Sequence, residues 1–402
     1  MELRQIIVGA PLTRTIYGER YLNDTKGNFS DYSEVDPRYD PQGSTATISF
    51  PFALVSKHNC AVFESQAPQF LLNWVEVAGS YKFFWHPDVQ RPGLKIAGAV
   101  KAQPTSSTRT VLTEQRPRIY IKTDLDKKHF RFVRRLRRSS VEHSIGICAD
   151  LRDFAVSLPA GVRFGFLPES LGIVLSQGTY EGSGVLFRET IAFPQIQEQR
   201  ILMPYHSLYA PDPFAPADEP LLVQMTKLHA PRRPRDYFVK DIVGPILESW
   251  VLLMSRRGIL PELHGQNTLA EIGPDLTIRR AIYRDFQGTY SDSAIRRSLG
   301  LPEFDKHIAG EEEGTTIASQ YSHVFDGMIG RYLLSRMVRA FCRYFGDTYG
   351  DVAAAVREYH RGIRGWDTAW FPQTIYRFAV SAQEQLGNDV SLVDSGEVPQ
   401  FR

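Results

Sequence analysis

A polar segment in the C-terminal half, residues 258–288, carries the side chains best suited to chemistry. It holds a closely spaced group and, after a strand–turn–strand stretch, an arginine–aspartate pair: Glu262, His264, Gln266, Asn267, Arg284 and Asp285. Carboxylate and amide oxygens suit Mg²⁺, which takes one or two carboxylates plus phosphate oxygens. A histidine can donate to a phosphate or a substrate carboxylate. Each residue alone fits a polar turn between hairpin strands, but the cluster predicts a site for Mg²⁺ and an anion.

A second segment, residues 104–110 with the sequence PTSSTRT, combines hydroxyls with Arg109 and Thr110. Hydroxyls, a guanidinium and turn amides can bind a polyphosphate where no glycine-rich loop exists. Such turns are also common loop chemistry, so this segment alone is weak evidence. Lys122 follows in a stretch where Ile119 and Ile121 alternate with polar positions, which predicts a half-buried strand.

A basic run, residues 127–138 with the sequence KKHFRFVRRLRR, comes next. Most of its members fit a solvated helix face. Because Phe130 and Phe132 are interleaved with the cations, a nucleic-acid-binding strip is a minor alternative.

The elements that must position these residues change character along the chain. The first forty residues are predicted to be irregular, and 69–78 is a short helix candidate. Period-two and β-branched patterns predict strands at 45–55, 81–85, 94–100, 118–125, 162–166, 172–175 and 184–189. Apolar residues at helical spacing predict helices over 236–257, kinked at Pro245 and ended by Gly258, and over 324–345. Strands followed by helices indicate an α+β fold. The chain has no GxGxxG or Walker A loop, so a standard Rossmann or P-loop site is not supported.

Bulk composition narrows the class of protein. The chain has 402 residues, a formal net charge of +2 and three widely spaced cysteines. Near-neutral charge gives no general attraction to nucleic acid or membranes. The cysteine spacing fits neither a disulfide scaffold nor a zinc site. No apolar stretch approaches the roughly 20 residues of a membrane span, and the amino terminus shows no signal-peptide pattern. We therefore expect a soluble, cytoplasmic protein with no nucleic-acid or membrane partner.

In combination and order, these motifs resemble the IucA/IucC family of siderophore synthetases, which work without a peptide-synthetase assembly line (NIS synthetases). The family's S-x-R-T signature, strand lysine and following arginine match Ser107, Thr108, Arg109, Thr110, Lys122 and Arg134. Its glutamate-histidine-glutamine-asparagine signature and arginine–aspartate pair match Glu262, His264, Gln266, Asn267, Arg284 and Asp285. Looser agreements are Glu169, Arg188 and Glu189. The resemblance covers roughly residues 95–380.

The resemblance implies an α+β fold with an antiparallel β-rich "fingers" unit and a mainly helical "palm" whose β-hairpin carries catalytic residues. The implied units are a shortened N-terminal region at 1–95, fingers at 96–225 and palm at 226–402. It also implies an ATP-dependent ligase that adenylates a carboxylic acid and joins it to an amine or hydroxyl, forming an amide or ester. Relatives of this kind are commonly homodimers, so a homodimer is expected.

The resemblance also suggests roles for the motif residues. Lys122, Arg134 and Arg109 would contact the phosphates and the substrate carboxylate, with His264 donating to one of these anions. Glu262 and Asp285 would hold Mg²⁺. The remaining ATP contacts are expected from the hydroxyl turn and from the amides: Ser107, Thr108, Thr110, Gln266 and Asn267.

The sequence departs from the family pattern in three places. Barely one hundred residues precede the S-x-R-T signature, where the family has a long helical "thumb". The family's histidine–proline motif is followed by Asp88 and Val89 in place of tryptophan and glutamine. Residues 371–380 supply Arg377 without the expected lysine. These differences leave the identity of both substrates open.

Two other functions fit the same residues. The order of the HGQN and DFQG segments superficially resembles a kinase catalytic loop followed by a magnesium-binding element, which would indicate a phosphotransferase. That reading lacks a catalytic-loop aspartate and a glycine-rich strand pair. A non-catalytic binding relative is the other alternative, and the intact motif argues against it.

Overall fold

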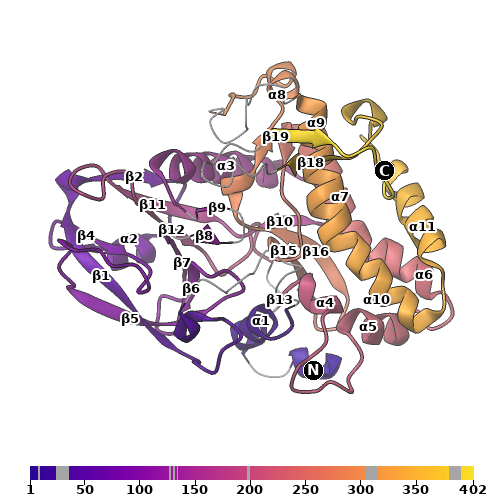
Figure 1. Cartoon of the computed structure of the whole chain (residues 1–402), viewed down its shortest axis with the longest axis horizontal. Coiled ribbons are helices and arrows are strands. Elements are labelled where there is room, and N and C mark those ends of the chain that lie inside the picture. The colour runs from indigo at the N-terminus through magenta and orange to yellow at the C-terminus, as the bar shows by residue number, and fades with distance from the viewer. Residues whose placement is uncertain are drawn as a thin grey trace.

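The computed structural model describes residues 1–7, 10–23, 36–125, 128–129, 132–133, 135–196, 200–304, 316–379 and 391–402. It is an α+β fold with a large antiparallel sheet at one end and a helical region around a smaller sheet at the other (Figure 1).

The N-terminal half forms a nine-stranded antiparallel sheet in the order β2-β11-β12-β7-β6-β5-β1-β4-β3. Its strands are β1 (Ile48–Ser56), β2 (Cys60–Glu64), β3 (Glu76–Val77), β4 (Ser80–Phe84), β5 (Gly98–Pro104), β6 (Thr110–Thr113), β7 (Tyr120–Thr123), β11 (Glu169–Leu175) and β12 (Gly184–Arg188). The sheet takes strands from both sides of residue 95, and the division into three units at 95 and 225 remains a prediction.

Two helices cover opposite faces of this sheet. Side chains of α2 (Gln69–Val75) share an apolar core with inward residues of the central strands, including Ile121 and Phe187. On the other face α3 (Arg138–Ser157) packs through Val141 and Ile145. The helix approaches closely because β11 and β12 have glycines there: a Cβ on Gly172 would lie 2.3 Å from Val141.

A second sheet has four strands in the order β10-β16-β15-β13, formed by β10 (Phe164–Phe166), β13 (Ile201–Pro204), β15 (Thr268–Ile272) and β16 (Ile278–Tyr283). Because β10 and β13 precede residue 226, the sheet is not confined to the expected palm range, and the name palm is used below for this sheet and the helices around it. β15 and β16 form an antiparallel hairpin, and β10 pairs with β16 in parallel. Short two-stranded pairs add β14 (Ile259–Leu260) with β17 (Tyr290–Ser291), and β18 (Tyr376–Ala379) with β19 (Ser391–Asp394).

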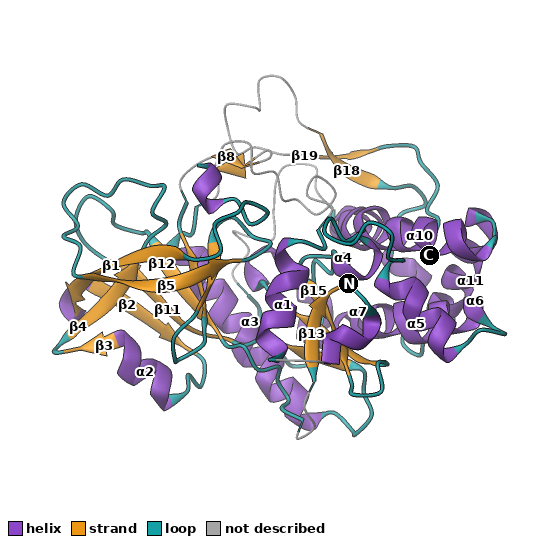
Figure 2. Ribbon diagram, turned by 90° about the horizontal axis from the view of Figure 1, so that it is seen from below, coloured by secondary structure: helices purple, strands orange, loops and turns teal. Residues whose placement is uncertain are grey.

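Helices lie around this second sheet (Figure 2). They contribute to the largest hydrophobic core, which includes the buried Trp250. They are α4 (His206–Tyr209), α5 (Leu221–His229), α6 (Pro234–Tyr237), α7 (Gly244–Arg257), α8 (Ser293–Ser298), α9 (Ile317–Ser322), α10 (Ser335–Phe345) and α11 (Tyr349–Arg361), with π-helical turns at Phe238–Val243 and His323–Leu334. Short 3₁₀ turns lie at Leu3–Ile7, Pro37–Tyr39, Lys57–Asn59, Phe286–Gly288 and Thr368–Trp370.

The expected α+β class is confirmed, and both long helices lie where the apolar spacing placed them. The kink expected at Pro245 takes the form of the π-helical turn just before it. A π-turn is a recognised cause of helix bending, and proline cannot donate to the preceding turn.

Two local expectations were wrong. The first forty residues contain α1 (Pro11–Arg20), which buries Ile16 and Gly18 against the palm. Its apolar residues are too few to give a periodic signal. The basic run is not one helix: Lys128–His129 and Phe132–Val133 are the paired strands β8 and β9, and α3 begins only at Arg138.

No helix among the described residues is both long enough and apolar enough to cross a bilayer.

Candidate active site

The two sheets meet at an ion pair between Lys122 of β7 and Asp285, which follows β16. The Lys122 ammonium donates to Asp285 Oδ1 at 2.5 Å across 163 residues of sequence. Lys122 is 2% exposed, whereas the Asp285 side chain keeps 26% of its surface accessible. The pair therefore connects the S-x-R-T side of the molecule with the palm motif, and its carboxylate is open to a ligand.

The strand register explains why a lysine lies at this point. Thr110, Lys122 and Leu186 oppose one another across β6, β7 and β12, so their side chains share one face of the sheet. Alternate residues such as Ile121 face the apolar core on the opposite side. Lysine is seldom buried unless it is paired, and the Asp285 carboxylate supplies the partner.

Arg188 and Glu169 extend this charged row, as the looser sequence agreements suggested. The Arg188 guanidinium donates to Glu169 Oε1 at 2.5 Å and lies 3.9 Å from Asp285 Oδ2. The backbone N–H of Phe286 donates to Glu169 Oε2 at 3.4 Å. Glu169 thus holds both Arg188 and the turn that carries Asp285.

Electrostatics at Asp285 favour its ionised form. Burial alone would raise the pKa of this carboxyl, but the positive charges of Lys122, Arg188 and Arg109 together bring it far below its usual range. Burial lowers the pKa of the Lys122 ammonium, and Asp285 opposes that effect. The cations around one carboxylate make the site attractive to a further anion.

Asp285 also has an unusual backbone conformation. Its φ is +71°, in the left-handed region, where aspartate is found more often than most non-glycine residues. The Tyr283 hydroxyl donates to its carbonyl at 3.1 Å. Such strained residues are common at functional sites, where surrounding contacts hold them.

The hydroxyl-rich turn between β5 and β6 carries Ser107, Thr108 and Arg109. The Arg109 guanidinium donates to Gln287 Oε1 at 2.7 Å and to the Arg135 carbonyl at 3.0 Å. Thr110 begins β6 opposite Lys122, and its buried hydroxyl has no hydrogen-bond partner within the described parts of the chain. A buried hydroxyl beside a lysine suits an oxygen-rich ligand.

The HGQN segment connects β14 to β15 and is tied to the hydroxyl turn. Gln266 Nε2 donates to the Ser106 carbonyl at 2.7 Å, and the Asn267 carbonyl accepts the Arg284 N–H at 2.9 Å. His264 is 6% exposed, and its Nδ1 accepts the Gln266 N–H at 3.3 Å. With Nδ1 as the acceptor, Nε2 carries the proton and can donate.

Glu262 lies over the turn that follows Asp285. A Cβ on Gly288 would lie 2.3 Å from Glu262 Oε2, so the absence of a side chain there makes room for the carboxylate. The structure therefore brings Glu262 to the same turn as Asp285, and their shared role at Mg²⁺ remains a prediction. Among the described residues, no group of three or more histidine, cysteine, aspartate or glutamate side chains could hold a metal ion by itself.

Arg284 forms a buried ion pair with Glu19 of α1. Both guanidinium ends donate to the Glu19 carboxylate, which also accepts the Ser106 N–H at 3.1 Å. Glu19 is fully buried, and the Arg284 charge brings down the pKa of its carboxyl against the effect of burial. Sequence reasoning missed Glu19, since nothing in PLTRTIYGER distinguishes a functional carboxylate.

Arg134, assigned to the phosphates from the sequence, lies outside the described residues. The other assigned residues converge on the junction between the two sheets.

The sequence was compared with models of known protein families. The model of the IucA / IucC family matches residues 87–210, the segment that contains the S-x-R-T turn and Lys122. That match confirms the resemblance that the motifs suggested.

Solved structures of siderophore synthetases share the fold of most of this chain. The petrobactin biosynthesis protein AsbB of Bacillus anthracis is 17% identical, with a TM-score of 0.67 over 89% of this chain and 68% of AsbB. ATP-bound aerobactin synthetase IucA of Klebsiella pneumoniae is 19% identical, with a TM-score of 0.63 over 83% of this chain and 65% of IucA. The aerobactin synthetase IucC of the same organism is 15% identical, with a TM-score of 0.62 over 90% and 71% of the two chains. A search of curated protein sequences gives no match.

Proposed function

We propose that the chain is an ATP-dependent ligase that adenylates a carboxylic acid and transfers the acyl group to an amine or hydroxyl. The observation that carries this proposal is the Lys122–Asp285 pair, which joins the S-x-R-T turn to the HGQN and arginine–aspartate motifs at one place. The fold shared with an ATP-bound aerobactin synthetase supports ATP as the nucleotide.

The first step must bring a carboxylate to the α-phosphate of ATP, so two anions have to approach. Catalysis of such a step depends mainly on neutralising charge and positioning the reactants. Lys122, Arg109 and Arg188 supply positive charge around the Asp285 turn. His264 would donate from Nε2, while Gln266 and Asn267 fix its loop against the Ser106 carbonyl and Arg284.

Pyrophosphate leaves in this step, and the acyl-adenylate then reacts with the amine or alcohol. We assign Lys122 and Arg134 to the phosphates, with Ser107, Thr108 and Thr110 contacting the same tail. No covalent intermediate with the enzyme is needed.

The residues present fit a magnesium ion. Glu262 and Asp285 approach the same turn, and two carboxylates are what Mg²⁺ uses when phosphate oxygens complete its shell. When bound, the ion would shield the negative charge of the phosphates. The ion pair with Lys122 orients the Asp285 carboxylate in the absence of a metal ion.

The relatives are named for petrobactin and aerobactin, so a siderophore or related natural product is the proposed product class. Small carboxylate and amine or alcohol substrates are the proposed partners. We further propose that the chain acts as a homodimer, which light scattering would contradict by giving the monomer mass at micromolar concentration.

Product analysis tests the proposed reaction. The protein is incubated with ATP and Mg²⁺ across a panel of carboxylates and amines, and nucleotides and conjugates are measured by mass spectrometry. Formation of AMP, pyrophosphate and a conjugate is expected. ADP would indicate the phosphotransferase, and no ATP consumption with any pair would favour the non-catalytic relative.

A further inference from the structure

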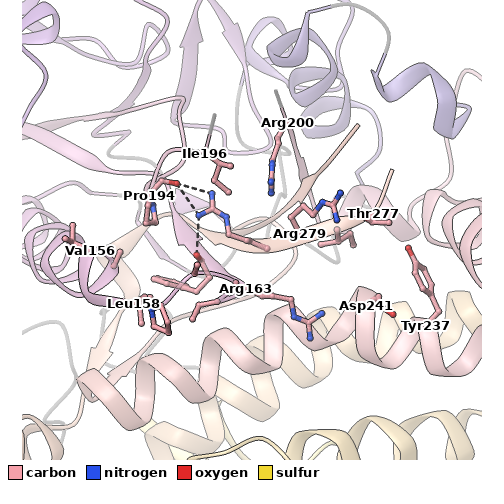
Figure 3. Close-up of a pocket in the computed structure, with 18 residues that line it drawn as sticks. Val156, Leu158, Arg163, Pro194, Ile196, Arg200, Tyr237, Asp241, Thr277 and Arg279 are labelled. Atoms are coloured by element: carbon pink, nitrogen blue, oxygen red, sulfur yellow. Dashed lines mark hydrogen bonds between the residues drawn. The ribbon is translucent and has the colours of Figure 1, made fainter. Parts of the chain in front are cut away.

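A second concave site lies on the palm, behind the far end of the β15–β16 hairpin. It has a volume of about 720 Å³, within the range of small-molecule pockets. Its wall is formed by the end of α3, the segment before β13, the turn of the hairpin and the start of the helix that continues into α7 (Figure 3).

One side of this pocket is cationic. Arg163, Arg200, Arg279 and Arg280 all line it. Their carboxylate partners are Glu248 for Arg163, Asp275 for Arg279, and a single Glu271 shared by Arg200 and Arg280. Four guanidinium groups thus share three partner carboxylates.

Asp241 also lines the pocket, and its carboxyl is the remaining acidic group there. Burial raises the pKa of this carboxyl, while the positive charges of Arg163 and Lys240 oppose that effect. With Asp241 counted, the four guanidinium groups face four carboxylates, so the donors that have no partner matter more here than net charge.

Two donors at the pocket have no partner among the described residues. The Tyr237 hydroxyl is buried and unpaired, although the residue is 8% exposed, and the Nε of Arg279 is likewise unpaired. Figure 3 shows the Tyr237 hydroxyl directed away from its own helix, toward the side of the pocket that holds Thr277 and Arg279. An unmade hydrogen bond costs about 1–3 kcal/mol, so a ligand acceptor that reaches these groups would be stabilised.

The opposite side of the pocket is apolar. Val156, Leu158, Pro159, Val162 and Ile196 line it, and Val156 is 75% exposed. A ligand that fills the space would bury this surface along with its own.

We propose that this pocket binds a small organic carboxylate with an apolar body, its carboxylate accepting from Tyr237 and Arg279. The site is distinct from the candidate active site. Arg279 and Asp285 are separated by most of β16, roughly 20 Å at about 3.3 Å per residue. The inference does not depend on the ligase reaction.

Hexanoate is the probe that tests this proposal. Calorimetry on the full chain should show saturable binding of one hexanoate at this pocket, while hexan-1-ol and hexylamine bind at least tenfold more weakly. Tyr237→Phe and Arg279→Gln should each weaken hexanoate binding about tenfold, the usual effect of losing one hydrogen bond to a charged group. Tyr237→Phe removes only an unpaired hydroxyl and should therefore fold normally. It still tests the proposal if the arginine variant folds poorly.

Matched controls separate this pocket from other sites. Tyr344→Phe and Arg297→Gln change exposed residues elsewhere and should leave hexanoate affinity unchanged. Lys122→Gln should also retain binding at the pocket. The proposal is overturned if hexanoate does not bind, if hexanol or hexyl phosphate binds as tightly, if both pocket variants bind normally, or if Lys122→Gln abolishes all binding.

Discussion

Glu19 and Arg284, 265 residues apart in sequence, form a two-ended ion pair with almost no solvent contact. The same carboxylate accepts from the backbone of Ser106, so one side chain fixes α1, the hydroxyl turn and the residue before Asp285. Glu19 is a positioning residue, because it acts on the candidate site only through its neighbours.

Glu19→Gln should therefore be strongly destabilising. Removing one partner leaves the Arg284 charge buried without compensation, which typically costs about 3–5 kcal/mol in the free energy of unfolding. Urea denaturation measures the loss. Glu142→Gln, at an exposed residue of α3 that is 3.9 Å from Arg138, should stay within about 0.5 kcal/mol of the parent. Similar losses in the two variants would show that the buried pair has no special role.

Lys122→Gln should reduce pyrophosphate release by about 100-fold or more, as expected when one charged group is removed from a developing anion. Lys101→Gln, on an exposed position of the same sheet, should keep full activity. Circular dichroism must show both variants folded. Full turnover in folded Lys122→Gln would remove this lysine from the site.

Arg134→Ala should lose adenylation, and Arg134→Lys should not restore it, because a point charge does not replace a planar two-ended donor. Arg138→Ala should retain activity, since this arginine lies on the surface at the start of α3. Pyrophosphate release measures all three. Equal activity in Arg134→Ala and Arg138→Ala would mean that the site belongs to another arginine, and graded, salt-dependent losses along the run would instead indicate nucleic-acid binding.

Acid should destabilise the protein between about pH 6.5 and 4. Burial lowers the pKa of His206 and His323 to about 4 and that of His360 to about 3. The unfolded chain takes up these protons near pH 6.5, whereas the folded chain does so only near pH 4 or below, so falling pH favours unfolding in this window.

Each such histidine contributes up to about 1.4 kcal/mol per pH unit to the slope of stability against pH. His206→Asn should reduce that slope, measured by urea denaturation at several pH values. The exposed His58→Asn should not change it. An unchanged slope in the His206 variant would contradict the assignment of a neutral, buried imidazole.

The sequence was informative where chemistry is concentrated in short motifs. Lys122 could be placed on a strand from the alternation around Ile121, and Glu262 and Asp285 reach one turn because a hairpin returns the chain. These patterns are local, so the residues next to each position in the sequence are enough to predict its secondary structure.

What could not be predicted depends on contacts between distant segments. Glu19 meets Arg284 only when α1 lies against the palm, and no pattern in the sequence around Glu19 predicts that contact. The strands at Lys128–His129 and Phe132–Val133 were mistaken for part of a helix, because a dense basic run hides the alternation. The unpaired Tyr237 hydroxyl likewise becomes visible only in three dimensions.

The Lys122–Asp285 and Glu19–Arg284 pairs both cross from the N-terminal part of the chain to the palm hairpin. Neither sheet by itself contains a complete set of candidate groups, so the site exists only while the two bodies are docked. The proposed activity should therefore depend on the contact between the two sheets. A substitution that loosens the junction is expected to abolish the proposed activity while every helix and strand stays intact. A ligand bound at the junction is expected to hold the two sheets together.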